Sequence, residues 1–169
     1  AIQLRYIDPD GEGSHTEPRR RLFPLVPDWA IRGLFRLSVA TENDTSGRII
    51  IAEGMEDALS LTKACPDSLV VGITGVPYLG KADLPEHGEV VVVRDGDAPG
   101  SAADKSLQTG VDRLILAGHG TVSVTKTPLG LDANDILQVE GPEKLRELVA
   151  AAELWDLSPE AQFENLAEL

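Results

Sequence analysis

Cysteine is nearly absent from the sequence, and aromatic residues make up only 4% of it. A single cysteine excludes a disulfide framework and a cysteine-based zinc cluster within the chain. Cys65 lies in an apolar helical stretch, so we interpret it as a packed thiol rather than a nucleophile. With few aromatics, the core must consist mainly of Val, Ile, Leu and Ala, which favours a buried parallel sheet flanked by helices.

Long hydrophobic runs are also missing, and no apolar stretch approaches the length that a transmembrane helix needs. The opening residues, Ala-Ile-Gln-Leu-Arg, do not have the pattern of a signal peptide. We therefore expect a cytoplasmic protein without a membrane partner.

Positive charge is scarce in most of the chain. Residues 1–48 hold seven Lys or Arg and seven Asp or Glu, so the whole net charge of −13 lies in residues 49–169. Affinity for a polyphosphate comes from Lys and Arg that displace counterions, so the general field of this acidic part does not hold nucleic acid. Action on nucleic acid would require metal ions and a basic partner. Alternatively, most of the acids form a solvated surface.

The first 47 residues have the pattern of a small β-rich subdomain followed by a linker. Residues 2–8 alternate apolar and polar side chains, Asp-Pro-Asp-Gly at residues 8–11 supplies a turn, and residues 20–25 are typical of a returning strand. A third short strand over residues 30–37 is expected to complete this unit. The composition of residues 40–47 is typical of a linker.

From residue 48 onward the predicted strands and helices alternate, which indicates an α/β domain built around a parallel sheet. We expect this domain to span residues 48–140, with C-terminal helices over residues 141–169 that pack on it or extend from it. The predicted strands cover residues 49–53, 69–74, 90–94 and 121–127, and the predicted helices cover residues 55–64, 99–116, 134–139 and 142–154.

Acidic residues follow two of these strands at the point where each strand ends. Glu53 ends one strand, and Asp95 and Asp97 follow another. In an open, mostly parallel sheet the ligand site lies at the carboxyl ends of the strands. Clustered carboxylates repel one another unless a cation lies between them, and hard divalent cations prefer oxygen ligands. The pattern therefore predicts a site for a cation such as Mg²⁺.

The same segments resemble the Toprim domain shared by primases, topoisomerases and some nucleases. The resemblance is carried by Ile-Ile-Ala-Glu-Gly at residues 50–54, Glu-Asp-Ala-Leu-Ser-Leu at residues 56–61 and Asp-Gly-Asp-Ala-Pro-Gly at residues 95–100. Leu-Asp-Ala-Asn-Asp-Ile-Leu at residues 131–137 is similar to a segment of bacterial-type and phage-type primases. Tyr-Ile-Asp-Pro-Asp-Gly at residues 6–11 and Pro-Arg-Arg at residues 18–20 look like the region before Toprim in primase-like proteins of phages and mobile elements.

This resemblance implies a Rossmann-like Toprim parallel sheet with helices on both faces, preceded here by the small β-rich subdomain. It implies that Asp95 and Asp97 bind Mg²⁺ or Mn²⁺, directly or through water. It also implies that Glu53 acts as a general acid or base in phosphodiester chemistry, or shares the metal.

Two further acids are open to two interpretations each. Asp57 is either a further metal ligand or an acid favoured by the N-terminal end of its predicted helix. Asp132 is either a metal ligand or the N-cap of the next helix, with Asp135 adding negative charge to the same helix end. Leu131 stands where primases often have a lysine, and Asn134 where they frequently have another acid. Both departures favour the N-cap interpretation.

Basic residues near these acids are candidates for binding nucleic acid or nucleotides. Arg19, Arg20 and Arg21 either grip a template strand or nucleotide phosphate, or belong to a solvated edge strand. Lys81 and Arg94 lie closer to the acids along the sequence, and a basic residue beside a metal-bound phosphate suits nucleotidyl transfer. Alternatively, Arg94 pairs with a neighbouring acid and holds the pocket together.

The predicted function is that of the Toprim catalytic fragment of a DNA primase-like protein. Such a nucleotidyltransferase makes RNA primers on single-stranded DNA from nucleoside triphosphates, with Mg²⁺ or Mn²⁺. A zinc module or a helicase domain would then lie elsewhere in the full-length protein. The alternatives are a Toprim nuclease that uses the same acids, and a non-catalytic, metal-dependent module that organises a nucleic-acid or helicase interface.

Overall fold

The alternating strands and helices predicted from residue 48 onward are present in the structure. It is a computed structural model that describes residues 2–5, 20–23, 34–36, 47–81, 84, 88–159 and 161. The chain divides into two units, one ending at Arg32 and the other beginning at Gly33. The elements are β1 (Ile2–Arg5), β2 (Arg20–Phe23), β3 (Leu34–Arg36), β4 (Arg48–Glu53), α1 (Met55–Ala64), β5 (Leu69–Ile73), the 3₁₀ helix η1 (Val76–Lys81), β6 (Glu89–Val93), α2 (Ala102–Leu116), β7 (Thr121–Val124), α3 (Ala133–Glu140), α4 (Pro142–Ala150) and β8 (Glu153–Leu154).

In the first unit β1 and β2 pair as an antiparallel hairpin, with Ile2 opposite Phe23 and Arg5 opposite Arg20. This pairing confirms the predicted hairpin. The predicted third strand does not complete this unit, because β3 pairs antiparallel with β5 of the second unit. Without β3, the outer side of β5 would have unpaired backbone N–H and C=O groups. A strand of three residues is too short for its sequence pattern to predict which strand it pairs with. The assignment of residues 48–140 as the functional domain stays a prediction.

The second unit contains a six-stranded sheet in the order β3, β5, β4, β6, β7, β8. The four central strands are parallel, and β3 and β8 are antiparallel at the two edges. The helix predicted over residues 142–154 is shorter, because α4 ends at Ala150 and β8 follows. Similarly, α2 begins at Ala102 rather than Pro99, because Ser101 caps it by accepting the backbone N–H of Asp104.

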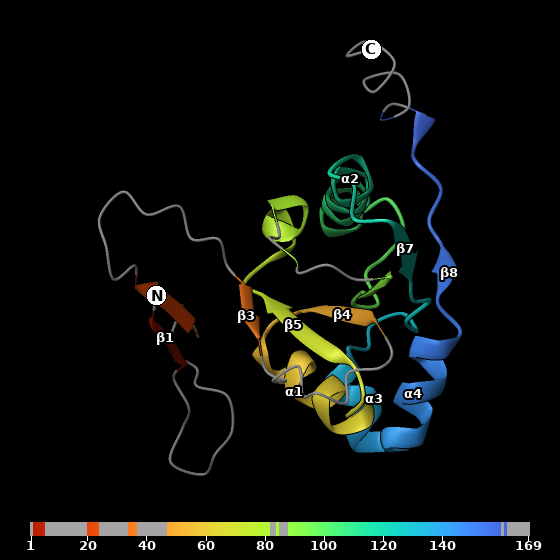
Figure 1. Cartoon of the computed structure of the whole chain (residues 1–169). Helices are drawn as coiled ribbons and strands as arrows, with labels where there is room; N and C mark the ends of the chain where they lie inside the picture. Colours follow the sequence, from red (N-terminus) through yellow and green to blue (C-terminus); the bar gives the residue numbers. More distant parts are fainter. Residues whose placement is uncertain are drawn as a thin grey trace. The chain divides into compact units, whose positions relative to one another are not determined.

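Helices cover both faces of this sheet (Figure 1). One face packs on α2 and η1, and the other packs on α1, α3 and α4. Successive residues of β4 enter opposite cores, Ile49 and Ile51 on the α2 side and Ile50 and Ala52 on the α1 side. Because both faces are buried, the interior positions of β4, β5 and β6 are apolar, as the sequence indicated.

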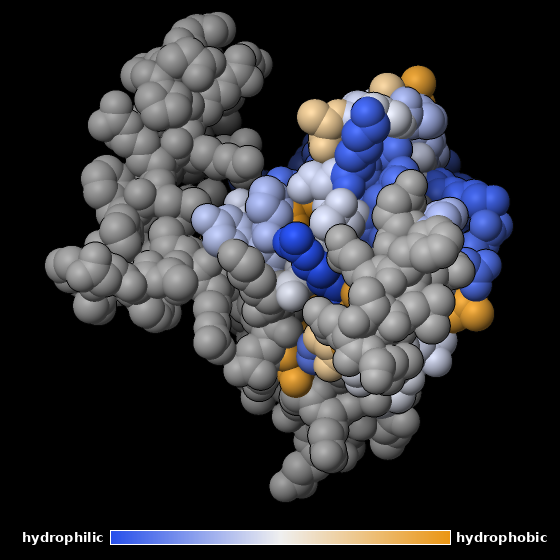
Figure 2. Space-filling model, turned by 90° about the horizontal axis from the view of Figure 1, so that it is seen from above, coloured by the Kyte–Doolittle hydropathy of each residue, from blue (hydrophilic) through white to orange (hydrophobic). Residues whose placement is uncertain are grey.

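The face of the molecule in Figure 2 is mostly hydrophilic where it is coloured, with hydrophobic residues scattered among polar ones. Within the part of the chain that the structure describes, no helix combines the length and the apolar character that crossing a bilayer requires.

Candidate active site

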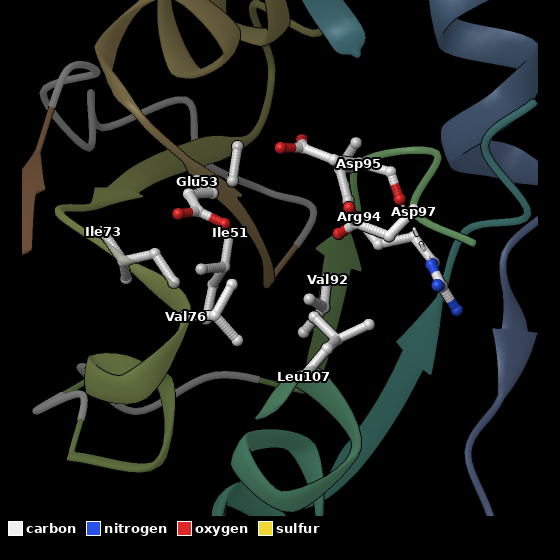
Figure 3. Close-up of a pocket in the computed structure, with 11 residues that line it drawn as sticks. Ile51, Glu53, Ile73, Val76, Val92, Arg94, Asp95, Asp97 and Leu107 are labelled. Atoms are coloured by element: carbon white, nitrogen blue, oxygen red, sulfur yellow. Dashed lines mark hydrogen bonds between the residues drawn. The ribbon is translucent and has the colours of Figure 1, made fainter. Parts of the chain in front are cut away.

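The carboxyl ends of β4 and β6 bring Glu53 close to the loop that carries Asp95 and Asp97. The two strands are parallel neighbours with Ala52 opposite Val93, so the chain leaves both strands at the same edge of the sheet. In Figure 3 the Asp95 carboxylate extends from this loop toward β4, the strand that carries Glu53. The structure therefore brings together the three acids that the sequence predicted at strand ends.

These acids line a small pocket with a hydrophobic floor (Figure 3). Glu53, Asp95 and Asp97 contribute to its walls, and Ile51 and Leu107 are among its apolar lining residues. The pocket has a volume of about 10 Å³, which is room for about one water molecule or ion. Its size suits an ion rather than an organic ligand.

Gly96 fixes the position of the two aspartates against the segment that follows β7. The Gly96 N–H donates to the Leu131 carbonyl at 2.8 Å, and the Gly130 N–H donates to the Gly96 carbonyl at 2.7 Å. A Cβ atom on Gly96 would lie 1.9 Å from the Pro128 carbonyl oxygen, so only glycine allows this approach. This role of Gly96 was not predicted from the sequence, although a glycine between two aspartates was its signal.

Asp132 follows this contact and caps α3. Its Oδ1 accepts the backbone N–H of Asp135 at 2.7 Å, and Asp135 Oδ2 accepts the backbone N–H of Asp132 at 3.3 Å. This reciprocal pair is a capping box. The predicted N-cap is thus confirmed, while a metal-binding role for Asp132 stays a prediction.

Asp57 is buried on α1 and contacts the start of α3. Its Oδ1 accepts the backbone N–H of Asn134 at 2.9 Å, and the Ser60 hydroxyl lies 3.1 Å from the Asn134 Oδ1. Burial raises the pKa of Asp57 to about 6, and the negative charges of Asp132 and Asp135 add to this rise. Asp57 therefore joins α1 to the N-terminus of α3, and its role as a metal ligand stays a prediction.

The electrostatics of Asp95 show how closely the acids gather. The pKa of Asp95 is raised to about 7 by burial, the largest cause, together with the negative charges of Asp57, Glu53, Asp132 and Asp97, in that order. We call these five residues the acidic cluster. A divalent cation bound among these carboxylates would relieve their mutual repulsion.

The acidic cluster suits a hard cation in its chemistry, because all of its members offer carboxylate oxygens. Among the residues that the structure describes, no three His, Cys, Asp or Glu side chains are grouped so that they could hold one ion together. Mg²⁺ is usually held by one or two carboxylates and completes its shell with water or substrate phosphates. Asp95 and Asp97 fit this kind of site, which relies on a ligand for further oxygens.

A comparison with protein families matches residues 48–143 to the Toprim domain. This match spans more than half of the chain and includes the whole acidic cluster. The chain belongs to the Toprim family. The family match confirms the resemblance that the strand-end motifs indicated.

This Toprim domain is similar to DNA primases. A DNA primase of Clostridium acetobutylicum is 29% identical over 136 residues, which cover 79% of this chain and 22% of that protein. The zinc-binding and RNA polymerase domains of the Aquifex aeolicus primase match with a TM-score of 0.64 at 22% identity, over 98% of this chain and 45% of that chain. A DnaG primase catalytic domain bound to single-stranded DNA matches with a TM-score of 0.65 at 16% identity, over 98% and 55%. The structural matches show a shared fold, and this chain spans about a fifth to just over half of each of these three.

Arg94 of the Toprim domain forms an ion pair next to the acidic cluster. Its Nη2 donates to Asp104 Oδ1 at 2.7 Å, and Asp104 also accepts the Gly100 N–H at 2.7 Å and the Gln108 amide at 3.0 Å. These bonds, the one from Gly100 first, lower the pKa of Asp104. The predicted pairing of Arg94 with a neighbouring acid is confirmed. Asp104 was not predicted from the sequence, although Ser-Ala-Ala-Asp at residues 101–104 indicates a helix cap.

The other predicted basic residues lie outside the described side chains. Arg20 and Arg21 belong to β2 and Lys81 is the last residue of η1, but the structure describes only their backbone. Arg19 is not among the described residues. The proposed contacts of these four residues with nucleic acid or nucleotides stay predictions.

Proposed function

We propose that this Toprim domain is the nucleotidyl-transfer part of a primase that makes RNA primers on single-stranded DNA. The observation that carries the proposal is the placement of Glu53 beside Asp95 and Asp97 at neighbouring strand ends. The similarity to a DNA primase and to primase folds supports it. One of the similar structures, the DnaG primase catalytic domain, is bound to single-stranded DNA, which supports the choice of template.

In this proposal Asp95 and Asp97 hold Mg²⁺ or Mn²⁺, with Asp57 and Asp132 as further candidate ligands. The bound ion would neutralise phosphate charge and align the attacking hydroxyl. Glu53 accepts the proton of that hydroxyl as its oxygen bonds to the α-phosphorus of a nucleoside triphosphate and pyrophosphate leaves. Asp57 holds the start of α3 in place, and Gly96 holds the aspartate loop against Leu131.

The partners follow from the same proposal. The substrates are nucleoside triphosphates and a single-stranded DNA template, which Arg19, Arg20 and Arg21 help to grip. We propose a zinc module or a helicase domain elsewhere in the full-length protein, and a cytoplasmic location.

Primer synthesis can be tested on one gel. The chain is incubated with single-stranded template, labelled nucleotides and Mn²⁺, with and without a chelator. Metal-dependent short labelled products are the expected result. Loss of template without synthesis would instead indicate a nuclease. Binding of metal and strand without either product, in the presence of the natural partner domains, would indicate a non-catalytic module.

Metal ions are expected to stabilise the folded chain. At a concentration 100 times the Kd, Mg²⁺ or Mn²⁺ should raise the melting temperature by roughly 5–10 °C. Asp95→Asn should remove this rise and also raise the melting temperature of the metal-free protein, because it relieves like-charge repulsion in the acidic cluster. Thermal melts at several metal concentrations measure both effects.

Asp156→Asn is the matched control, because Asp156 is an exposed aspartate beyond β8. It should leave the metal-induced rise unchanged. A full rise in the double variant Asp95→Asn, Asp97→Asn would place the ion elsewhere.

A further inference from the structure

A second, larger pocket adjoins the first one, and it is lined in part by Arg94, whose side chain points away from Glu53 in Figure 3. Arg94 and Asp97 line both pockets, so the second pocket is directly next to the one that Glu53, Asp95 and Asp97 line. Its volume is about 220 Å³, against about 10 Å³ for the first. The first pocket has room only for an ion or a water molecule. An organic ligand needs a larger space, such as that of the second pocket.

Hydrogen bonds between two strand ends fix the walls of the second pocket. Thr125 Oγ1 accepts the backbone N–H of Arg94 at 3.2 Å, and the Thr127 hydroxyl donates to the Arg94 carbonyl. The two threonine hydroxyls lie 3.1 Å apart. Asp104 holds the guanidinium of Arg94. These bonds hold the lining residues in place, so the pocket does not need a ligand to form.

Two cationic side chains line this pocket. The guanidinium of Arg94 has five N–H donors, so it can serve a ligand in addition to Asp104. Lys126 pairs with Glu153 at 2.6 Å, and the two side chains are 74% and 62% exposed. An ion pair so exposed to water contributes little to the stability of the fold. Phosphate oxygens can therefore replace the Glu153 carboxylate at Lys126.

Part of the pocket lining is hydrophobic and open to solvent. Leu129 is 73% exposed, and Pro99 is also exposed. Both residues line the second pocket. Such residues offer a surface on which a sugar or the flat face of a base can pack.

We infer that the second pocket binds a nucleotide, with its phosphates at Lys126 and Arg94 and its sugar or base against Leu129 and Pro99. The inference rests on the proposed function only in placing this nucleotide beside the metal at Asp97. A free nucleoside triphosphate and the terminal nucleotide of a strand share the required chemistry. Because Asp97 repels a bare phosphate, we expect Mg²⁺ to tighten binding.

Equilibrium titration of the whole chain with ATP, with and without Mg²⁺, tests the phosphate contact. Lys126→Gln should raise the Kd about 3-fold to 10-fold, because a charge-assisted contact is lost. Glu153→Gln should lower the Kd, because it removes the competing carboxylate. Lys144→Gln is the matched control, since Lys144 is also an exposed lysine that pairs with a glutamate, at 3.3 Å on α4.

Inorganic triphosphate separates the phosphate contact from the nucleoside contact. Leu129→Ser should raise the Kd for ATP and leave the Kd for inorganic triphosphate unchanged. The control is Val139→Ser, because Val139 is 83% exposed on α3 and does not line this pocket. Lys126→Gln should raise both Kd values.

A 5′-phosphorylated single-stranded oligonucleotide distinguishes the two sources of the nucleotide. An effect of Lys126→Gln on ATP alone assigns the pocket to the incoming nucleotide, and an effect on the strand alone assigns it to the strand end. Equal Kd values for Lys126→Gln and Lys144→Gln with every ligand would overturn the inference. Because these titrations need no catalysis, their outcome is independent of whether the gel shows primer synthesis.

Discussion

Glu53→Gln is expected to lower the rate of primer synthesis by about 100-fold to 10,000-fold, the range for the loss of a general base. Glu53 ends β4 beside β6, the strand that leads to Asp95 and Asp97. Glutamine keeps the shape of the side chain but cannot accept the proton of the attacking hydroxyl. Single-turnover synthesis on a fixed template, measured with saturating Mn²⁺, gives the rate.

The same variant should keep its metal-induced rise in melting temperature if Glu53 acts only on the proton. The matched control is Glu89→Gln, which makes the same chemical change at the opposite end of the sheet, where Glu89 pairs with Arg48 at 2.7 Å. Synthesis by Glu53→Gln at the rate of Glu89→Gln would exclude Glu53 as the general base. Loss of the metal effect would instead assign Glu53 to the metal.

Gly96→Ala is expected to destabilise the fold by about 3 kcal/mol or more, which lies at the upper end of the cost of overpacking a close contact. The new Cβ would meet the Pro128 carbonyl oxygen at 1.9 Å and the Gly130 nitrogen at 2.8 Å. Both are backbone atoms, so neither can rotate away. The two segments must separate, which breaks the bonds to Leu131 and Gly130 and moves Asp132 away from Asp95.

Thermal melts and the gel assay measure this effect. The melting temperature should fall by roughly 6–12 °C or more, and synthesis should be lost even below the new transition. Gly88→Ala is the control, because its Cβ would meet its nearest atom, the Gly47 carbonyl oxygen, at an ordinary 3.6 Å. Equal stability and activity of the two variants would contradict a positioning role for Gly96.

The strand ends show how far local pattern determines a site. A β-branched run followed by Asp95 and Asp97, and a second run ending in Glu53, were sufficient to predict two parallel strands with acids at one edge. This succeeded because the apolar run of a buried strand and the acid that ends it are neighbours in the sequence, and because alternating strands and helices favour a parallel sheet. The capping role of Asp132 was predictable for the same reason, since its partner Asp135 is three residues away.

Contacts between distant segments were decided only by the tertiary structure. Asp57 bonds to Asn134, which is 77 residues further along the chain, and no local pattern separates this contact from a helix-end preference or a metal ligand. The pairing of β3 with β5 likewise depends on which sheet edge is open. The second pocket arises because Arg94 meets Thr125 and Thr127 across two strands.

The sequence by itself determined that Glu53, Asp95 and Asp97 lie at the carboxyl ends of buried strands, because apolar runs and the acids that end them are local features. The tertiary structure decided how those acids are held together, through the close approach of Gly96 to Pro128 and Leu131. It also decided the raised pKa of Asp95, because burial and repulsion act through space and depend on every segment that packs around the carboxylate.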